Sequence, residues 1–231
     1  MKNLYLIIGF LQIINLGYSQ QNDCACSAER DYDTQLQEGL ISFEYRIRVS
    51  DNEGLQYFNN WTQGEVMMSN GDIIRNLYLR YNKYLDELLY LRQSDFRVGI
   101  LKKDAIKGFR IKNDMNQISS LFVKKQVLLT KNDSTEVYLH LLASGPLTLY
   151  AYRNVGITNS RYALGENTKY LIATPGGEYF VTLKRKSLLG IPLIQKNDMK
   201  IILRTNRITP DNNEREFTRA ISIYNATHQQ Q

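Results

Sequence analysis

The chain has 231 residues, of which 29 are Lys or Arg and 23 are Asp or Glu, so its formal net charge at pH 7 is +6. Hydrophobic residues make up 43% of it, which is typical of a globular protein with a buried core and excludes a disordered, charge-rich chain. The moderate positive charge is compatible with an anionic surface as a partner and also with an ordinary solvated surface.

The N-terminus has the three parts of a secretory signal peptide. Lys2 supplies a positive charge, an apolar stretch follows from Leu4 to Ile14, and Gly17 and Ser19 are small residues at a cleavage site. The apolar stretch is shorter than the roughly 20 residues of a transmembrane helix. We therefore expect residues 1–19 to be removed on export. We expect no transmembrane helix in the mature chain and no nucleic acid as its partner.

Residues 20–39 are polar and have no hydrophobic period, so we interpret them as a flexible leader. They contain both cysteines of the sequence, Cys24 and Cys26. A disulfide between residues two apart would be strained, and neither cysteine can cross-link the main domain internally. The interpretations left open are a simple tether and an intermolecular disulfide.

Residues 40–183 are predicted to form an antiparallel β domain of about ten short strands. Residues 43–49 alternate apolar and polar side chains, as a half-buried strand does. Asn70-Gly71 lies between two apolar runs and is the strongest short signal for a β-hairpin. The other strand-like runs are separated by turn residues and lie at residues 64–68, 73–81, 87–92, 96–101, 106–111, 121–130, 137–141, 147–152, 170–173 and 178–183.

Three segments of the β domain lack the strand period. Residues 55–61 are rich in aromatic side chains and predict a short helical turn. Residues 153–167 contain Gly and Asn and predict a loop. Residues 174–177 read Thr-Pro-Gly-Gly and predict a hairpin turn.

Residues 184–226 are predicted to be C-terminal helices packed on the β domain. Pro210 is allowed in the first turn of a helix, and Asp211 and Glu214 have the spacing of a capping box. Each helix carries an apolar stripe that must be buried, and the sheet is the nearest surface: Met199, Ile202 and Leu203 on the first, and Phe217, Ile221 and Tyr224 on the second. The predicted fold class is α+β, mainly antiparallel β, with a barrel and a sandwich both open.

Two stretches of the sequence resemble a known family. Residues 61–66, 70–72 and 77–82 are similar to the "G-x-V … N-G … L-R-Y-N" pattern of uncharacterised exported proteins of Bacteroidota. Residues 180–189 and the closing helix through Asn225 resemble the same family. The resemblance covers both ends of residues 57–226 and is thin in the middle. It implies a protein of the periplasm or the outer-membrane periphery, and it carries over no catalytic residue.

Several residues are candidates for binding, each beside a structural interpretation. In the L-R-Y-N pattern, pairing of Arg80 with a carboxylate such as Glu87 is preferred to ligand binding. Tyrosines on the later strands suit interfaces and sugar stacking, with strand packing as the preferred interpretation; the candidates are Tyr138, Tyr150 and Tyr152.

The C-terminal region offers two further binding candidates. The run Lys184-Arg185-Lys186 could meet anionic lipid headgroups, although a solvated junction between sheet and helices is preferred. The stripe Phe217, Ile221 and Tyr224 could dock onto another protein if it does not pack on the sheet.

The sequence contains no recognisable catalytic motif. Neither histidine, His140 nor His228, has further ligands at zinc-binding spacing, so no metal or other cofactor is predicted. G-x-S-x-G, S-x-x-K, P-loop and G-x-G-x-x-G motifs are absent. What stays open for a hydrolase is a pair of carboxylates, either Asp86 with Glu87 or Glu136 with Glu178.

Three functions follow from these observations. The first is a non-enzymatic cell-envelope protein that binds a protein partner or the membrane surface. The second is a β domain that binds a small apolar ligand or a glycan, and the third is a carboxylate-dependent hydrolase. The first leads, because catalytic motifs are absent and both ends resemble an envelope family.

Overall fold

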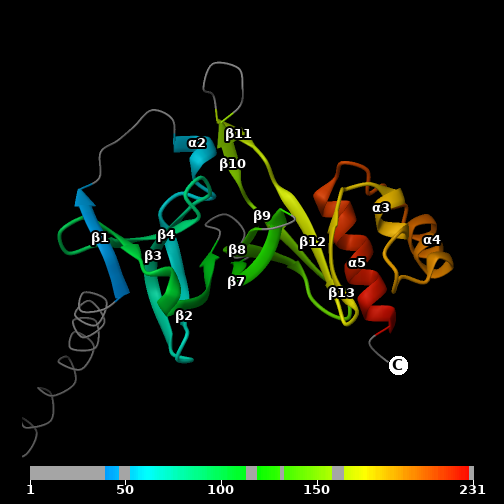
Figure 1. Ribbon diagram of the computed structural model, residues 1–231, viewed down its shortest axis with the longest axis horizontal. Coiled ribbons are helices and arrows are strands. Elements are labelled where there is room, and N and C mark those ends of the chain that lie inside the picture. The colour runs from blue at the N-terminus through cyan, green and yellow to red at the C-terminus, as the bar shows by residue number, and fades with distance from the viewer. Residues whose placement is uncertain (1–39, 47–52, 113–118, 131–132, 158–163, 229–231) are drawn as a thin grey trace, which may run out of the picture. The chain divides into compact units, whose positions relative to one another are not determined.

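The structure is a computed structural model that describes residues 40–46, 53–112, 119–130, 133–157 and 164–228 (Figure 1). The predicted signal peptide, the leader with its two cysteines and residues 47–49 of the first predicted strand lie outside the described residues. Residues from Ser42 onward form one unit, and the account below concerns that unit.

The described chain is mainly antiparallel β with helices at its C-terminal end, as predicted. Its strands are β1 (Ile41–Arg46), β2 (Thr62–Met68), β3 (Ile73–Asn82), β4 (Glu87–Arg92), β5 (Arg97–Leu101), β6 (Ile106–Lys112), β7 (Ser119–Thr130), β8 (Asp133–Ala143), β9 (Thr148–Tyr152), β10 (Val155–Ile157), β11 (Leu164–Glu166), β12 (Lys169–Thr174) and β13 (Gly177–Val181). Its helices are α2 (Glu53–Gln56), α3 (Arg185–Leu189), α4 (Lys196–Thr205) and α5 (Glu214–His228), with a 3₁₀ turn at Lys103–Ala105.

Eleven of the described strands form one sheet in the order β1-β5-β4-β3-β2-β6-β7-β8-β9-β12-β13. The sheet is not closed into a barrel. Strands β1 and β13 are its edges, and the arrangement is sandwich-like. The remaining two strands, β10 and β11, pair with each other.

The turn chemistry read from the sequence is largely confirmed. Strands β2 and β3 are antiparallel, and between them Gly71 has φ of 98° and donates its N–H to the carbonyl of Met68 at 3.1 Å. Thr174 pairs with Gly177 across the β12–β13 hairpin. The prediction of a loop at residues 153–167 was wrong, because β10 and β11 lie there. Each of these strands has only three residues with a glycine in the middle, which hides the strand period.

The sheet coils on itself around two glycines. A Cβ on Gly64 of β2 would lie 2.4 Å from the carbonyl oxygen of Arg110, and one on Gly108 of β6 would lie 2.5 Å from that of Phe122. Register shifts also separate β2 from both of its neighbours, and such bulges increase the local twist. As a result β3 reaches β8 across three intervening strands: the ring centroids of Tyr81 and Tyr138 are 6.1 Å apart.

The inner face of this coil holds a cluster of buried rings that we call the aromatic core: Tyr81, Phe109, Phe122 and Tyr138. Phe109 and Phe122 are directly paired across β6 and β7. Their rings are stacked with centroids 4.7 Å apart, while Tyr138 meets Phe109 edge to face. Each buried aromatic side chain of this size stabilises the fold by about 2–3 kcal/mol. Burial of these four rings therefore stabilises the coiled arrangement of the sheet.

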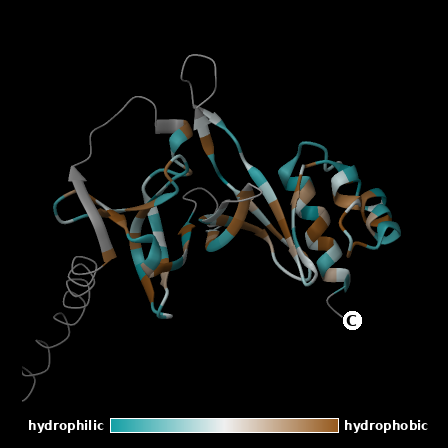
Figure 2. Cartoon of the chain, viewed as in Figure 1, coloured by the Kyte–Doolittle hydropathy of each residue, from teal (hydrophilic) through white to brown (hydrophobic). Residues whose placement is uncertain are grey.

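A second core lies between the helices and strands β8, β9 and β12. The predicted stripe of Phe217, Ile221 and Tyr224 is buried here together with Leu149 and Ile172 of the sheet. Hydrophobic and hydrophilic residues alternate along α4 and α5 in Figure 2, as expected for amphipathic helices. The helices therefore cover the sheet of the same chain, as the sequence predicted.

The start of α5 differs from the prediction. The helix begins at Glu214, and Asn213 caps it, because its Oδ1 accepts the N–H of Glu216 at 3.1 Å. Asp211 instead accepts the N–H of Arg185 at 3.0 Å, so the predicted capping box of Asp211 with Glu214 was wrong. The sequence also gave no sign of α3 as a separate short helix ahead of α4.

Candidate functional site

The first candidate site is a groove of about 810 Å³ over β3, β2 and β6, which we call the outer groove. Glu65 and Arg110 are directly paired there and alternate with Val66 and Phe109, which point inward. Successive strand residues face opposite sides, so the groove lies on the face away from the aromatic core. Six of its lining residues matter below: Trp61, Glu65, Arg75, Tyr78, Arg110 and Lys112.

A bulge in β3 shapes the outer groove. Gly64 pairs with Leu77 but Val66 pairs with Ile74, so β3 has one residue more than β2 at this point. Asn76 has φ of 60°, a left-handed conformation that few residues other than Gly and Asn adopt.

Two guanidinium groups, from the strands on either side of β2, lie close to the carboxylate of Glu65. Arg110 donates to Glu65 with an Nη1–Oε1 distance of 2.6 Å, and the Nε of Arg75 lies 3.6 Å from the other carboxylate oxygen of Glu65.

The predicted candidate Arg80 lies next to this groove and is only 8% exposed. Its guanidinium carbon is 3.8 Å from the ring centroid of Tyr57 and 5.9 Å from that of Trp61, and its Nε donates to the carbonyl of Asn59 at 3.2 Å. These are cation–π and hydrogen-bond contacts. The structural role that the sequence favoured for Arg80 therefore rests in part on aromatic rings and a carbonyl oxygen.

The second candidate is a groove of about 880 Å³ among the C-terminal helices, which we call the basic groove. Its lining includes four cationic side chains and no acidic one: Arg185, Lys200, Arg204 and Arg207. Lys200, Arg204 and Arg207 follow one another at helical spacing of four and three along α4 and its end. Arg185 comes from α3. Two separate elements therefore direct positive charge to one concave surface.

Arg207, which lines the basic groove, has a left-handed backbone conformation. It has φ of 52° just after α4, where the N–H of Ile208 donates to the carbonyl of Leu203 at 2.9 Å. This is a Schellman end, whose left-handed position usually holds glycine. A side chain with a Cβ costs about 1 kcal/mol in that conformation.

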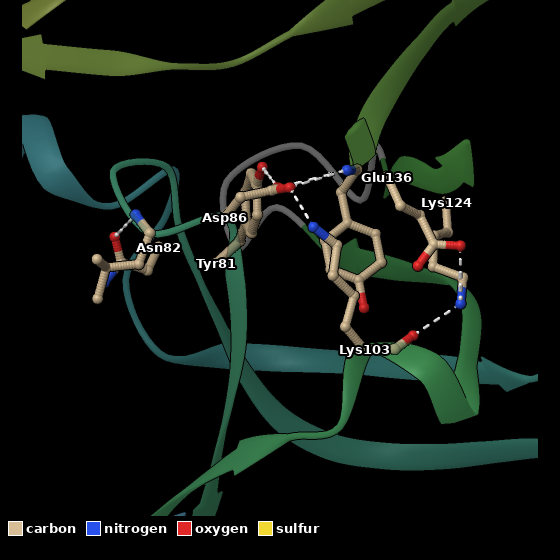
Figure 3. Close-up of polar contacts among 8 residues, drawn as sticks. Tyr81, Asn82, Asp86, Lys103, Lys124 and Glu136 are labelled. Carbon is tan, nitrogen blue, oxygen red and sulfur yellow. Dashed lines mark hydrogen bonds and ion pairs between the residues drawn. The ribbon is translucent and has the colours of Figure 1, made fainter. Parts of the chain in front are cut away.

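A third cluster is buried inside the coil, where Asp86 joins the β3–β4 turn to β8 (Figure 3). Its carboxylate accepts hydrogen bonds from the hydroxyl of Tyr81 at 2.5 Å, from Nζ of Lys103 at 2.5 Å and from the N–H of Tyr138 at 3.3 Å. Burial raises the pKa of the Asp86 carboxyl, and the charge and hydrogen bond of Lys103 offset part of that rise. Through these three donors Asp86 connects β3, the 3₁₀ turn at Lys103 and β8.

Lys124 and Glu136 extend the Asp86 cluster along β7 and β8. Nζ of Lys124 lies 3.3 Å from Glu136 and donates to the carbonyl of Lys103 at 2.9 Å. Burial raises the pKa of Tyr138 well above its ordinary value, and within the described residues its hydroxyl is buried without a hydrogen-bond partner.

Of the two carboxylate pairs named for a hydrolase, Glu136 and Glu178 do not converge. Glu136 pairs with Lys124, and Glu178 pairs with Lys125. Lys124 and Lys125 are adjacent in β7, and adjacent strand residues point to opposite faces of the sheet. The two glutamates therefore lie on opposite faces.

Asp86 and Glu87 do lie close together: burial raises the pKa of Glu87, the charge of Lys103 lowers it and the charge of Asp86 raises it. The oxygens of Asp86 are occupied by the donors of the buried cluster.

His140 lies where the two cores meet. Its ring stacks on Phe122 with centroids 4.8 Å apart, and Nη2 of Arg153 donates to its Nδ1 at 3.1 Å. Because Arg is always a donor, this contact requires an unprotonated Nδ1. Burial, and then the charge of Arg153, lower the pKa of His140 to about 4.

Arg153 continues this contact to the first residue of α5. It holds Glu214 through two hydrogen bonds of 2.7 and 2.8 Å, and the hydroxyl of Tyr170 donates to the same carboxylate at 2.8 Å. Burial alone would raise the pKa of Glu214, but the hydrogen bonds and charge of Arg153 outweigh it and lower the pKa. The sheet and α5 are thus joined by a chain of charge-assisted hydrogen bonds.

The remaining predicted residues are distributed as follows. Tyr152 is buried with Leu171 in a separate cluster, against which Tyr150 is partly buried. Phe217, Ile221 and Tyr224 are 0%, 0% and 4% exposed, so they fill the helical core. Lys184 and Lys186 are exposed, and Arg185 between them lines the basic groove.

Sequence reasoning missed the other cations of the basic groove and all of the outer groove except its neighbour Arg80. The basic face of α4 was readable, because Lys200, Arg204 and Arg207 repeat with the period of a helix. The outer groove had no such signal. It depends on β2 pairing with β6, two strands far apart in the sequence.

Among the described residues, no group of three His, Cys, Asp or Glu side chains is placed to hold a metal ion. The described helices are all too short or too polar to span a membrane. Comparison of the chain with protein-family models, with curated proteins and with solved structures gave no match.

Proposed function

We propose that this protein is a non-enzymatic binding protein of the cell envelope that docks onto an anionic membrane surface through the basic groove. The observation that carries the proposal is the convergence of four cations, with no acidic residue, on one groove. The signal-peptide pattern and the resemblance to exported proteins support the compartment, and the pattern of charge supports the partner.

The ordinary structural explanation of these cations is incomplete. Cations near a helix C-terminus interact favourably with its dipole, which accounts for Arg204. It does not account for Arg185, which belongs to another helix, or for an arginine at the left-handed position of the Schellman end, where glycine is usual. None of the four makes an ion pair with a residue that the structure describes.

An exposed apolar side chain among the charges fits a lipid surface better than a free anion. Ile201 lines the groove between Lys200 and Arg204 along α4 and is 52% exposed. An exposed apolar side chain among cations can enter the headgroup region while the cations contact phosphates.

The expected strength is that of reversible docking. Each Lys or Arg near an anionic membrane contributes about 1 kcal/mol, so four give about 4 kcal/mol before the apolar contribution. Such binding is weakened by salt, because exposed charges are screened over about 10 Å at 0.1 M.

Vesicle co-sedimentation of the mature chain tests the proposal. Binding should require phosphatidylglycerol in the vesicles and should decrease with salt. Lys200→Gln with Arg204→Gln should lower vesicle affinity about thirty-fold, since two cations contribute about 2 kcal/mol. The control, Lys107→Gln with Arg215→Gln, removes two exposed cations elsewhere and should bind as the parent does.

Three results would contradict the proposal: equal binding to neutral vesicles, equal losses in the two double variants, or no binding to any vesicle. Binding to an acidic polypeptide but not to phosphatidylglycerol would replace the membrane with a protein partner at the same groove.

A further inference from the structure

We infer that the outer groove is a binding site for an acidic saccharide. In this assignment a sugar ring packs on the aromatic side chains of the groove, and its carboxylate or sulfate lies against Lys112 and Arg75. The inference is independent of the membrane proposal, because the two grooves share no residue.

The charge balance of the groove calls for an anionic ligand. Arg75, Arg110 and Lys112 face a single carboxylate, that of Glu65. Arg110 is bound to Glu65 at 2.6 Å, while Arg75 is 66% exposed at its side chain and its Nε lies 3.6 Å from Glu65. Lys112 is exposed and makes no ion pair with any described residue. The exposed side chains of Arg75 and Lys112 can therefore donate to a carboxylate or sulfate.

The aromatic side chains give the groove its second property. Trp61 and Tyr78 both line it and both are partly exposed. Such side chains present an apolar face and a polar edge, which suits a sugar ring with apolar C–H groups on its face and hydroxyls around it. The guanidinium of Arg80 lies over the rings of Tyr57 and Trp61 and supports the indole from one side. The aromatic surface of the groove is therefore in place before a ligand binds.

A peptide is a poorer occupant than a saccharide. Peptides commonly bind a sheet by adding a strand to a free edge, but β2 is hydrogen-bonded to β3 on one side and to β6 on the other. The groove therefore offers side chains and no unpaired strand. Cross-strand pairing explains Glu65 with Arg110. It does not explain Lys112, whose directly paired neighbour on β7 is the uncharged Ser119.

The chain itself supplies a specific probe, because Trp61 is its one tryptophan. The mature protein is titrated with trigalacturonate, with a sulfated heparin disaccharide and with a neutral trisaccharide, and tryptophan emission and heat of binding are both recorded. We expect saturable binding of at least one acidic saccharide and none of the neutral one. The acidic saccharide that binds identifies the anionic group as carboxylate or sulfate.

Matched variants locate the site. Lys112→Gln should weaken binding of the acidic saccharide at least ten-fold, while Lys107→Gln, on the same strand but outside the groove, should leave it unchanged. Trp61→Phe should still bind by calorimetry and Trp61→Ala should not, with melting temperatures confirming that both are folded.

The inference is overturned by any of four results. These are no emission change and no heat with either acidic saccharide, equal binding of the neutral one, equal losses in the two lysine variants, and tighter binding of tetraglutamate than of the saccharides. None of these results bears on vesicle binding, so the two proposals fail separately.

Discussion

Acidification should destabilise this protein through His140, and the size of the effect follows from its surroundings. The ring is packed on Phe122 and accepts a hydrogen bond from Arg153, so it has no place for a second proton on Nδ1. Burial lowers its pKa most, the charge of Arg153 lowers it further, and Glu214 opposes them, with a result of about 4.

The sign follows from the two states. In the unfolded chain His140 takes up a proton near its ordinary pKa of about 6.5, whereas in the folded protein it stays neutral down to about pH 4. Between these values the unfolded state binds more protons, so the free energy of unfolding falls as the pH falls. Since a pKa difference of one corresponds to about 1.36 kcal/mol, the difference of about 2.5 is worth about 3 kcal/mol near pH 4.

Urea unfolding at neutral pH and near pH 4 measures this loss, with His140→Asn as the comparison. Asn keeps an oxygen for Arg153 but does not titrate. Its free energy of unfolding should therefore fall about 3 kcal/mol less than that of the parent over the same interval. Acid-sensitive groups that do not interact with His140 contribute equally to both proteins and cancel in the difference, whereas Glu214 titrates together with His140. Equal losses in the two proteins would show that His140 is not held neutral by the fold.

Three further substitutions test the packing. Phe217→Ala should cost about 3–5 kcal/mol because the ring is fully buried, whereas Phe96→Ala, with the ring 70% exposed, should cost under about 0.5 kcal/mol; urea midpoints measure both. Asn225→Asp should cost about 3 kcal/mol or more by the same assay, because the buried amide Nδ2 donates to the carbonyls of residues 144 and 147 and a carboxylate cannot. Gly64→Ala should lower the melting temperature through its 2.4 Å clash, while Gly156→Ala, with no neighbour within 4 Å, should leave it unchanged.

Features set by local chemistry could be predicted from the sequence. The hairpins at Asn70-Gly71 and at residues 174–177 depend on turn residues that few other conformations accept. The stripe on α5 depends on a helical period. Where several local signals competed, the sequence was ambiguous: Pro210, Asp211 and Asn213 all suit a helix start, and the contact of Asp211 with the N–H of Arg185 leaves the cap to Asn213.

The candidate sites could be predicted only where their residues lie on one secondary-structure element. A basic face of α4 follows from its sequence, but nothing in the sequence brings Arg185 to it. The outer groove requires Glu65 to meet Arg110, 45 residues away, and that meeting depends on the order of strands in the sheet. The buried Asp86 was no more prominent in the sequence than any other acidic residue in a turn.

The strand order also has a consequence for how this chain folds. Most neighbours in the sheet are consecutive in the sequence, so the meanders β2–β5 and β6–β9 can each assemble from contacts of short range, which form quickly. The contact of Asp86 with the N–H of Tyr138 spans 52 residues and carries a larger loop-closure entropy. We therefore expect two meanders to form early and to be joined late, when the carboxylate of Asp86 in the β3–β4 turn of one accepts the N–H of Tyr138 in β8 of the other.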